Sequence, residues 1–247
     1  MSDLSGKTTI VVGASRGLGH GIATAFAEAG SRVVAVSRTG APFAEPAGAG
    51  STVPELADAG DPTVAGSLLD RYRPEVVVLA AGASPHMRPL QHQTWETFSV
   101  NWQTDVRIAF HWLREALLTP LRPGSRVIVV SSGAAMAGSP LSGGYAGAKA
   151  TQRFITGYAQ DEANRAGLDI TFSAVLPRIT PATELGRSAA RAYAARDGRS
   201  EEEYLKQMGP LLTPEIAGAA MVELVRTEAT AVAPGYLLTG AGLKKLP

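Results

Sequence analysis

Tyr145 and Lys149 are the first side chains in this sequence whose types and spacing suggest chemistry. They stand four residues apart in the segment Tyr145-Ala146-Gly147-Ala148-Lys149. On a helix this spacing puts both on one face, about 6 Å apart along the axis at about 1.5 Å per residue. A phenol beside an ammonium group can donate or accept a proton. Because the same spacing is common on helix surfaces, a helix face without catalytic function is the alternative for this pair alone.

Ser131 and Ser132 give the tyrosine and the lysine a context. The two serines directly follow the apolar run 126–130 and precede the tyrosine. In an open α/β sheet, ligands bind at the carboxyl ends of the strands, and the end of this run is such a position. The sequence therefore predicts a hydroxyl, a phenol and an amine close together at one edge of a sheet.

A glycine-rich segment near the N-terminus predicts a phosphate site. Gly13-Ala14-Ser15-Arg16-Gly17-Leu18-Gly19 follows the first apolar run and opens a helix, with the spacing G-x-x-x-G-x-G. Glycines let the backbone turn sharply and approach a pyrophosphate, while the helix N-terminus offers free N–H groups and the positive end of its dipole. The alternative is a glycine-rich turn without a ligand.

The end of the second apolar run indicates which dinucleotide binds. An NAD enzyme places an acidic residue there to bind the ribose 2′-hydroxyl, whereas this chain has Ser37-Arg38. Arg16 and Arg38 could flank a 2′-phosphate, for which the planar guanidinium is well suited. This predicts NADP(H); the alternative is two solvated surface arginines.

Short apolar runs alternate with amphipathic helical segments along the chain. Runs buried on both faces and separated by helices are typical of a parallel sheet covered on both sides. The fold class is therefore α/β, a doubly wound parallel sheet (Rossmann fold), and at 247 residues we expect a single domain spanning 1–247. The expected strands are 9–12, 32–36, 75–80, 126–130, 169–175 and 236–238, and the expected helices are 21–29, 95–118, 146–166 and 214–227.

Two segments depart from this alternation. Residues 39–54 are rich in Ala, Gly and Pro and show no periodicity, so we expect the helix usual between the second and third strands to be short or missing. Residues 178–208 carry many Arg, Ala and Glu residues. They predict a small helical insertion over the strand ends that covers the substrate.

The composition excludes several functions. The 23 basic and 22 acidic residues nearly cancel and form no block, which argues against nucleic acid and membrane surfaces as partners. The absence of cysteine excludes disulfides and thiolate chemistry, and four scattered histidines predict no metal site. The N-terminal seven residues lack the order of a signal peptide, and no apolar run exceeds strand length, so we expect a soluble, cytoplasmic protein.

The series of motifs resembles the short-chain dehydrogenase/reductase family over nearly the full length of the chain. Landmarks of that family occur here in the family's order. They are Gly13, Gly17 and Gly19, then Asp58, Ala80-Ala81-Gly82, Asn101, Ser132, Tyr145 with Lys149, and Pro177.

The resemblance implies four catalytic residues. Ser132 would hydrogen-bond the substrate oxygen, in preference to Ser131, and Tyr145 would donate its proton in reduction or accept one in oxidation. Lys149 would bind the nicotinamide ribose and favour the phenolate of Tyr145. Asn101 would bend its helix and hold a water molecule of the proton relay.

The cofactor residues come from the glycine segment and from the resemblance together. Asp58 matches the family's adenine-binding aspartate, and Thr180 its carboxamide contact. Arg178 stands where the family usually has glycine, a departure beside the nicotinamide contacts. The full expected set is Gly13, Ser15, Arg16, Gly17, Leu18, Gly19, Ser37, Arg38, Asp58, Ala59, Ala81, Gly82, Tyr145, Lys149, Pro177 and Thr180.

Substrate contacts are expected from the loops at the strand ends. The apolar character of 134–141 predicts a pocket for a hydrophobic or acyl-chain ketone, and the alternative is that these residues pack as core. The arginines of the insertion, Arg187, Arg191 and Arg196, suggest either recognition of an acidic carrier or a solvated helix face. The expected substrate residues are Ser84, His86, Ala134, Met136 and Leu141.

These observations favour an NADPH-dependent oxidoreductase that reduces a ketone, including a 3-oxoacyl group, or oxidises the corresponding alcohol. One rival is a non-catalytic NADP(H) sensor or regulatory protein on the same fold, against which Tyr145 and Lys149 argue. A dehalogenase or lyase is a second rival, against which the intact glycine segment argues. By analogy with the family, we expect a homo-oligomer, a tetramer or a dimer, through outer helix faces carrying Ile108, Phe110 and Phe154.

Overall fold

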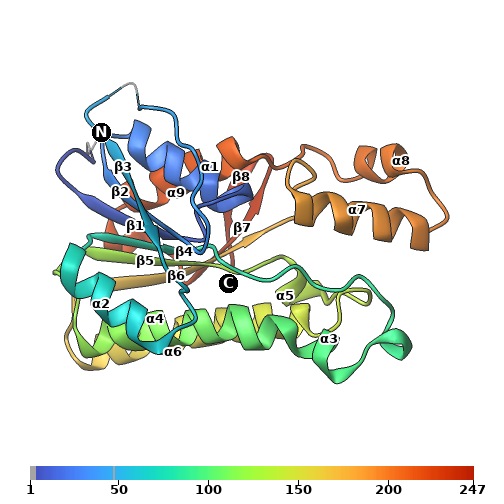
Figure 1. The fold of residues 1–247 in the computed structure, drawn as a ribbon, viewed down its shortest axis with the longest axis horizontal. Coiled ribbons are helices and arrows are strands. Elements are labelled where there is room, and N and C mark those ends of the chain that lie inside the picture. The colour runs from blue at the N-terminus through green and yellow to red at the C-terminus, as the bar shows by residue number, and fades with distance from the viewer. Residues whose placement is uncertain (1–3, 47) are drawn as a thin grey trace.

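The computed structural model describes residues 4–46 and 48–247, and one eight-stranded sheet forms its centre (Figure 1). The strand order is β3-β2-β1-β4-β5-β6-β7-β8, parallel except for the final antiparallel pair. The α/β doubly wound sheet predicted from the sequence is therefore confirmed. The strands are β1 Thr8–Val12, β2 Arg32–Ser37, β3 Ser51–Leu56, β4 Val76–Leu79, β5 Ser125–Val130, β6 Ile170–Pro177, β7 Gly235–Thr239 and β8 Gly242–Lys245.

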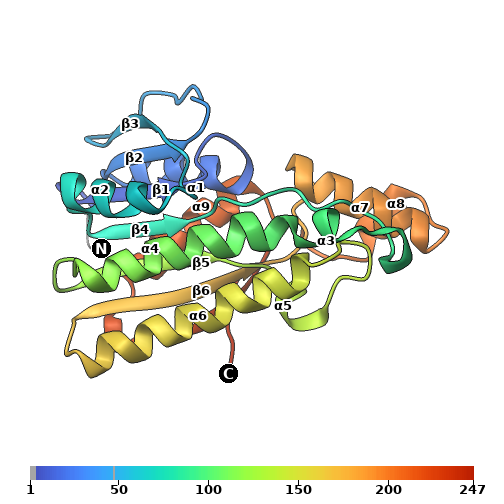
Figure 2. The ribbon, with the colours of Figure 1, turned by 60° about the horizontal axis from the view of Figure 1, so that its bottom comes forward.

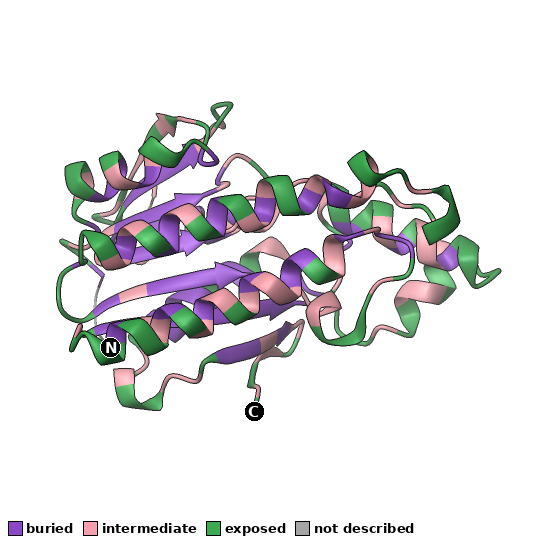
Figure 3. Cartoon of the chain, turned by 90° about the horizontal axis from the view of Figure 1, so that it is seen from below, coloured by how far each residue is buried: buried purple, intermediate pink, exposed green. Residues whose placement is uncertain are grey.

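Helices cover both faces of the sheet, because the central strands are apolar on both sides. Helices α1 and α9 lie on one face and α2, α4 and α6 on the other (Figures 1 and 2). Each face has its own core, and Figure 3 shows the central strands and parts of the covering helices coloured as buried. The longer helices are α1 Gly17–Glu28, α2 Pro62–Tyr72, α4 Arg107–Leu118, α6 Tyr145–Arg165, α7 Glu184–Arg196 and α9 Pro214–Arg226. Short helical segments are η1 Leu90–His92, α3 Trp95–Asn101, η2 Trp102–Val106, α5 Ala134–Ala137, α8 Glu201–Lys206 and η3 Ala229–Ala231.

Six elements were not expected from the sequence: the strands β3 and β8, the helix α2, and the short segments η1, α5 and η3. Strand β3 contains Pro54 and lies at the sheet edge, where a missing N–H does not interrupt a ladder. The described residues of the segment 39–54 contain no helix, as expected, but α2 lies between the expected second and third strands, 32–36 and 75–80, so the helix there is not missing. Residues 1–3 and Ala47 lie outside the described residues. The predictions for the N-terminus and for the 39–54 segment partly rest on them.

The helical stretch expected at 95–118 is one continuous rod that changes pitch in its middle. Helix α3 passes into a π turn, η2, directly after Asn101, and α4 continues from Arg107. Such a wide turn interrupts the regular hydrogen bonds of the helix and frees a carbonyl. The side chain of Gln152 on α6 donates to the carbonyl of Asp105 at 2.9 Å and so replaces the missing bond.

The insertion expected at 178–208 is helical and extends beyond the strand ends (Figure 1). Thr183 and Ser200 accept hydrogen bonds from the first turns of α7 and α8, which fixes where the two helices begin. Arg191 pairs with Glu201 at 2.9 Å and ties the two helices together, whereas Arg187 and Arg196 are exposed. Within the described part of the chain, no helix is long and apolar enough to cross a membrane.

Candidate active site

A cleft of about 800 Å³ runs along the carboxyl ends of β1, β2 and β4. It brings together most of the residues that the sequence predicts to bind a dinucleotide, at the strand ends where such sheets bind ligands. Of its lining residues, Arg38 follows β2 and Lys149 contacts the end of β5, and β1 and β4 lie between these two strands. Its lining contains the expected Gly13, Ser15, Arg16, Gly17, Leu18, Gly19, Ser37, Arg38, Asp58, Ala59, Ala81, Gly82, Tyr145 and Lys149.

The glycine segment packs too closely for side chains at two of its glycines. Gly13 has a φ of +88°, and a Cβ there would lie 2.6 Å from the backbone of Ala81. A Cβ on Gly19 would lie 2.1 Å from the carbonyl oxygen of Gly13. The N–H of Gly13 donates to Val36 at 2.8 Å, which fastens the loop to β2. These contacts hold the N-terminus of α1 open towards the cleft, where its first N–H groups can face an anion.

Arg16 adopts a position that the sequence did not predict. Its guanidinium pairs with Glu184, at the start of α7, at 2.7 Å, so the ion pair joins the glycine segment to the insertion. Both side chains are largely exposed, and an exposed pair of this kind contributes little to stability. Arg38 is exposed at the end of β2, and Ser37 bonds the carbonyl of Thr39. Both arginines line the cleft, Arg16 in an ion pair and Arg38 exposed at the end of β2.

The two serines after β5 have different surroundings. Ser131 is buried, and its hydroxyl donates to the carbonyl of Lys149 at 2.7 Å, which fixes the tyrosine helix to the sheet. Ser132 is half-buried, lines a cavity, and accepts a hydrogen bond from the N–H of Ala134 at 3.2 Å. Its hydroxyl hydrogen is thus available for a ligand. Both serines line this cavity, so they differ in how their hydroxyls are engaged and not in their access to it.

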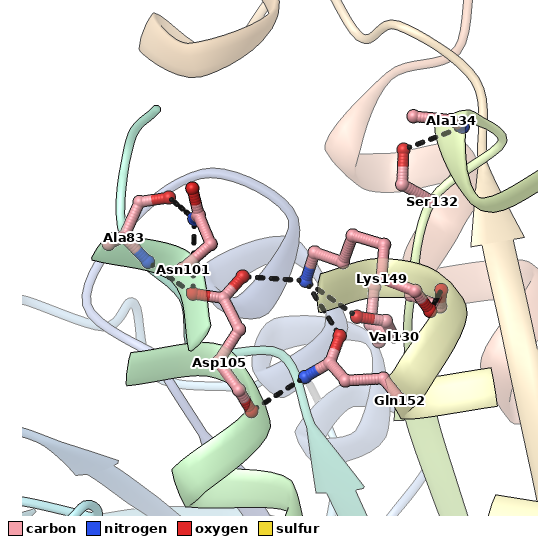
Figure 4. A network of polar contacts seen from close by, with 9 residues as sticks. Ala83, Asn101, Asp105, Val130, Ser132, Ala134, Lys149 and Gln152 are labelled. Atoms are coloured by element: carbon pink, nitrogen blue, oxygen red, sulfur yellow. Dashed lines mark hydrogen bonds and ion pairs between the residues drawn. The ribbon is translucent and has the colours of Figure 1, made fainter. Parts of the chain in front are cut away.

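Lys149 is buried and held by a network of acceptors (Figure 4). Its ammonium lies 3.0 Å from Asp105 Oδ2, 3.0 Å from Gln152 Oε1 and 3.3 Å from the carbonyl of Val130. It also lies 5.6 Å from the centre of the Tyr145 ring. Burial disfavours its charged form, but the attraction of Asp105 and Tyr145 and a hydrogen bond to Asp105 outweigh this, so the pKa of Lys149 is raised.

Asn101 is fully buried behind the cleft, at the start of the π turn. Its side-chain N–H donates to the carbonyl of Ala83 at 2.7 Å and to Asp105 Oδ1 at 3.3 Å. Among the described residues, no donor reaches its Oδ1, which is also buried. A buried acceptor of this kind calls for a partner, and a water molecule fits that requirement. The helix changes to a π turn directly after Asn101, the residue at which the resemblance implies a bend.

A second cavity of about 600 Å³ lies between the segment after β5 and the insertion; we call it the insertion cavity. Ser84, Ser132, Ala134 and Met136 line it, as expected of substrate residues. Apolar and aromatic residues from other segments also line it, namely Pro85, Met87, Ile179, Tyr193, Tyr204, Met208 and Leu237, together with the charged Arg178 and Glu184. The rings of Tyr193 and Tyr204 are stacked, with centres 6.5 Å apart.

Four expected ligand contacts lie elsewhere. His86 is exposed and Leu141 is buried, and neither lines the cleft or the insertion cavity. The carbonyl of Leu141 accepts from the N–H of Arg88, beside the bridge between residues 88 and 142, and its side chain is buried. Pro177 and Thr180 line the insertion cavity instead of the cleft. The hydroxyl of Thr180 bonds the carbonyl of Arg178 at 3.1 Å, so the segment folds back on itself after β6.

The sequence reasoning missed Asp105, Gln152 and Glu184. All three take part in polar contacts beside the cleft. A signal for Asp105 existed, because it is an acidic residue four positions after Asn101 in a stretch read as an amphipathic helix. Gln152 had a similar signal, because it stands three positions after Lys149 on the expected helix, whereas Glu184 had none.

The chain belongs to the short-chain dehydrogenase/reductase family, because the family model "short chain dehydrogenase" matches residues 7–194. It is therefore an oxidoreductase of a family that uses a nicotinamide dinucleotide and acts on carbonyl or alcohol groups.

Curated relatives and solved structures agree with this assignment. The chain is 31% identical over 229 residues to versicolorin reductase 1 of Aspergillus parasiticus, covering 87% of this chain and 86% of the relative. It is 30% identical over 191 residues to a hydroxynaphthalene reductase-like protein of Metarhizium majus, covering 70% and 68%. A short chain dehydrogenase from Mycobacterium avium has a similar structure, with a TM-score of 0.76 at 22% identity, covering 100% of this chain and 86% of that one. At that identity the structural likeness supports the fold alone.

Proposed function

We propose that this protein is an NADP(H)-dependent oxidoreductase that reduces a hydrophobic ketone or oxidises the corresponding alcohol. The observation that carries this proposal is the position of Tyr145, which lines both the long cleft and the insertion cavity. A phenol between two cavities can exchange a proton with a substrate in one while a dinucleotide occupies the other. The uncapped start of α1 and the length of the cleft, from Arg38 to Lys149, fit the dinucleotide.

Each side chain has a defined role in the proposed reaction. Bound NADPH would supply the hydride. Ser132 would donate a hydrogen bond to the substrate oxygen, and Tyr145 would give its proton to that oxygen as negative charge develops. Lys149 would place its positive charge beside the phenol, and Asn101 would hold a water molecule on its free buried oxygen.

The insertion cavity favours a flat, apolar ketone as the substrate. Its methionines adapt to irregular shapes, and its two stacked tyrosines offer aromatic surface. The name of one relative contains hydroxynaphthalene, a fused two-ring aromatic compound, and both curated relatives are named as reductases or reductase-like. We propose a cyclic or aromatic ketone ahead of a 3-oxoacyl thioester.

The direct test follows the absorbance of NADPH with purified protein and a panel of cyclic ketones, aromatic ketones, quinones and 3-oxoacyl thioesters. We expect NADPH oxidation with at least one cyclic or aromatic ketone and none with the Tyr145→Phe variant. Tight NADPH binding without turnover across the panel would favour the sensor hypothesis instead.

Replacing Arg38 by aspartate tests the choice of coenzyme. We expect Arg38→Asp to raise the dissociation constant of NADPH about tenfold or more, because a charge-assisted contact to the 2′-phosphate contributes about 1.5–3 kcal/mol and each 1.4 kcal/mol is about tenfold. Binding of NADH, which lacks that phosphate, should change less than about twofold. Arg165→Asp, an equal charge change at the exposed end of α6, is the control. Equal losses for NADPH and NADH would contradict the assignment of NADP(H).

We also propose that the protein is a homo-oligomer, a dimer or a tetramer. Helices α4 and α6 lie side by side (Figure 2) and expose large apolar side chains, including Phe110 at 53% and Phe154 at 61%. Ile108, expected on this face, is instead buried in the core. Light scattering after size exclusion should give a mass of two or four chains, and Phe154→Glu should lower it. The control, Leu56→Glu, removes an exposed leucine from the sheet edge. A single-chain mass for the unaltered protein would contradict the proposal.

A further inference from the structure

Asp105 is a buried carboxylate for which the proposed reaction has no role. It is fully buried in the π turn, and its side chain lies in the lining of the long cleft. Its Oδ1 accepts from the N–H of Ala83 at 2.8 Å, and its Oδ2 pairs with the Lys149 ammonium at 3.0 Å (Figure 4). A Cβ on Gly82 would lie 2.7 Å from Oδ2, so the carboxylate fits there because residue 82 is glycine.

The carboxylate balances the charge of the catalytic lysine. The Lys149 ammonium donates hydrogen bonds to Gln152 and to the carbonyl of Val130, and it forms an ion pair with Asp105. Of these three groups only Asp105 carries a charge, so Lys149 and Asp105 together are neutral. The other carboxylates that line the cleft are all exposed and therefore act through water, namely Glu28, Asp58, Glu184 and Glu215.

The Lys149 end of the cleft is where a bound nicotinamide would lie. In dinucleotide-binding sheets of this kind the adenosine ribose is recognised at the end of β2, here at Arg38, and the pyrophosphate at the N-terminus of the helix after β1. The part of the dinucleotide left for the opposite end is the nicotinamide. This ring carries a positive charge when oxidised and none when reduced.

We propose that Asp105 is a positioning residue that fixes and neutralises Lys149, and that it thereby favours binding of the oxidised, cationic nicotinamide. This rests on the proposed function, because it requires that a nicotinamide dinucleotide occupies the cleft. Without the carboxylate, the buried ammonium would face the cationic ring uncompensated, and repulsion between buried like charges is weakly screened. Stabilising the oxidised form makes the bound reduced form a stronger hydride donor, which suits a reductase.

The test compares the dissociation constants of NADP⁺ and NADPH for the full-length protein, measured by calorimetry, in the unaltered protein and in Asp105→Asn. Asparagine keeps the shape and removes the charge. We expect the ratio of the NADP⁺ constant to the NADPH constant to rise about tenfold, a shift of about 1.4 kcal/mol. An unchanged ratio would overturn the proposal.

Two controls separate charge from packing. Gln152→Leu removes another buried acceptor of Lys149 without changing the charge, and the ratio should stay within about twofold even if both affinities fall. Asp161→Asn removes a charge from an exposed site on the same helix and should change neither constant. A rise in the ratio with Gln152→Leu equal to that with Asp105→Asn would show that packing, not charge, is responsible.

The outcome is distinguishable from a failure of the proposed function. If Asp105→Asn does not fold, Asp105→Ser, which leaves room for water beside Lys149, makes the same comparison. If the unaltered protein prefers NADH, the ratio of NAD⁺ to NADH is measured instead, and only the coenzyme assignment is wrong. If it binds no nicotinamide dinucleotide, both the proposed function and this inference are wrong.

Discussion

Phenylalanine in place of Tyr145 is expected to lower the rate of ketone reduction by about a thousandfold or more while the dissociation constant of NADPH changes less than about twofold. The substitution removes one hydroxyl and keeps the ring that lines both cavities. Positioned proton transfer contributes about 10²–10⁴-fold to a rate, and here the same hydroxyl also stabilises the oxygen on which charge develops. Single-turnover measurement of NADPH oxidation separates this loss from any change in product release.

Tyr158→Phe is the matched control for this prediction. Tyr158 lies on the same helix, α6, and is 61% exposed. The Tyr158→Phe variant should retain the rate of the unaltered protein. Light scattering checks that the variant also keeps the assembly state, since Tyr158 lies on the exposed face of α6. A Tyr145→Phe variant that kept more than about a tenth of the rate would remove Tyr145 from the role of proton donor.

The fold followed from the sequence because its signals are local and repeated. Apolar runs such as 76–79 are buried on both faces, and that alone indicates a parallel sheet with helices on both sides. The same reasoning failed for β3, because Pro54 and its half-exposed neighbours do not resemble a buried strand. It failed for β8 because this four-residue strand is partly exposed and rests on its pairing with β7.

The candidate site was predictable where a single segment carries the chemistry. The glycine segment and the pair Tyr145 and Lys149 each have a spacing with a local meaning, and the structure places all of them around one cleft. His86 and Leu141 were expected there on the strength of loop position alone, and the path of a loop depends on contacts made by distant residues. Asp105 meets Lys149 because a π turn in one helix faces a second helix, a relation that spacing within either segment does not encode, whereas Gln152 meets Lys149 from three residues further along the same helix.

Methionine in place of Lys149 is expected to destabilise the protein by about 3–5 kcal/mol, in addition to abolishing turnover. The lysine side chain is 7% exposed and that of Asp105 1%. Removing one partner of a buried ion pair leaves the other charge without compensation, and such changes typically cost about 3–5 kcal/mol. Denaturant unfolding at pH 7 measures this loss. An unfolding free energy within about 1 kcal/mol of the unaltered protein would show that Asp105 does not depend on the lysine.

The stability difference between the unaltered protein and Lys149→Met should depend on pH in one direction. The pKa of Lys149 is raised in the folded protein, because the attraction of Asp105 and Tyr145 outweighs the effect of burial. A group whose pKa is raised by folding stabilises the protein fully below its unfolded value, near 10.4, and loses that contribution as the pH rises through the folded value. The stability advantage of the unaltered protein over Lys149→Met should therefore be constant near neutral pH and shrink above about pH 10.5.

The double variant Lys149→Met with Asp105→Asn separates stability from catalysis. Removing both charges leaves two neutral side chains in the buried site, and replacing a whole buried ion pair is often close to neutral for stability. We therefore expect the double variant to regain most of the stability lost by Lys149→Met while its turnover stays abolished. The unfolding free energy of the double variant then reports the contribution of the charge pair to folding. Its turnover reports separately the contribution of the lysine to proton transfer. If the double variant were no more stable than Lys149→Met, the stability of this site would come from packing around the lysine chain and not from the pairing of the two charges.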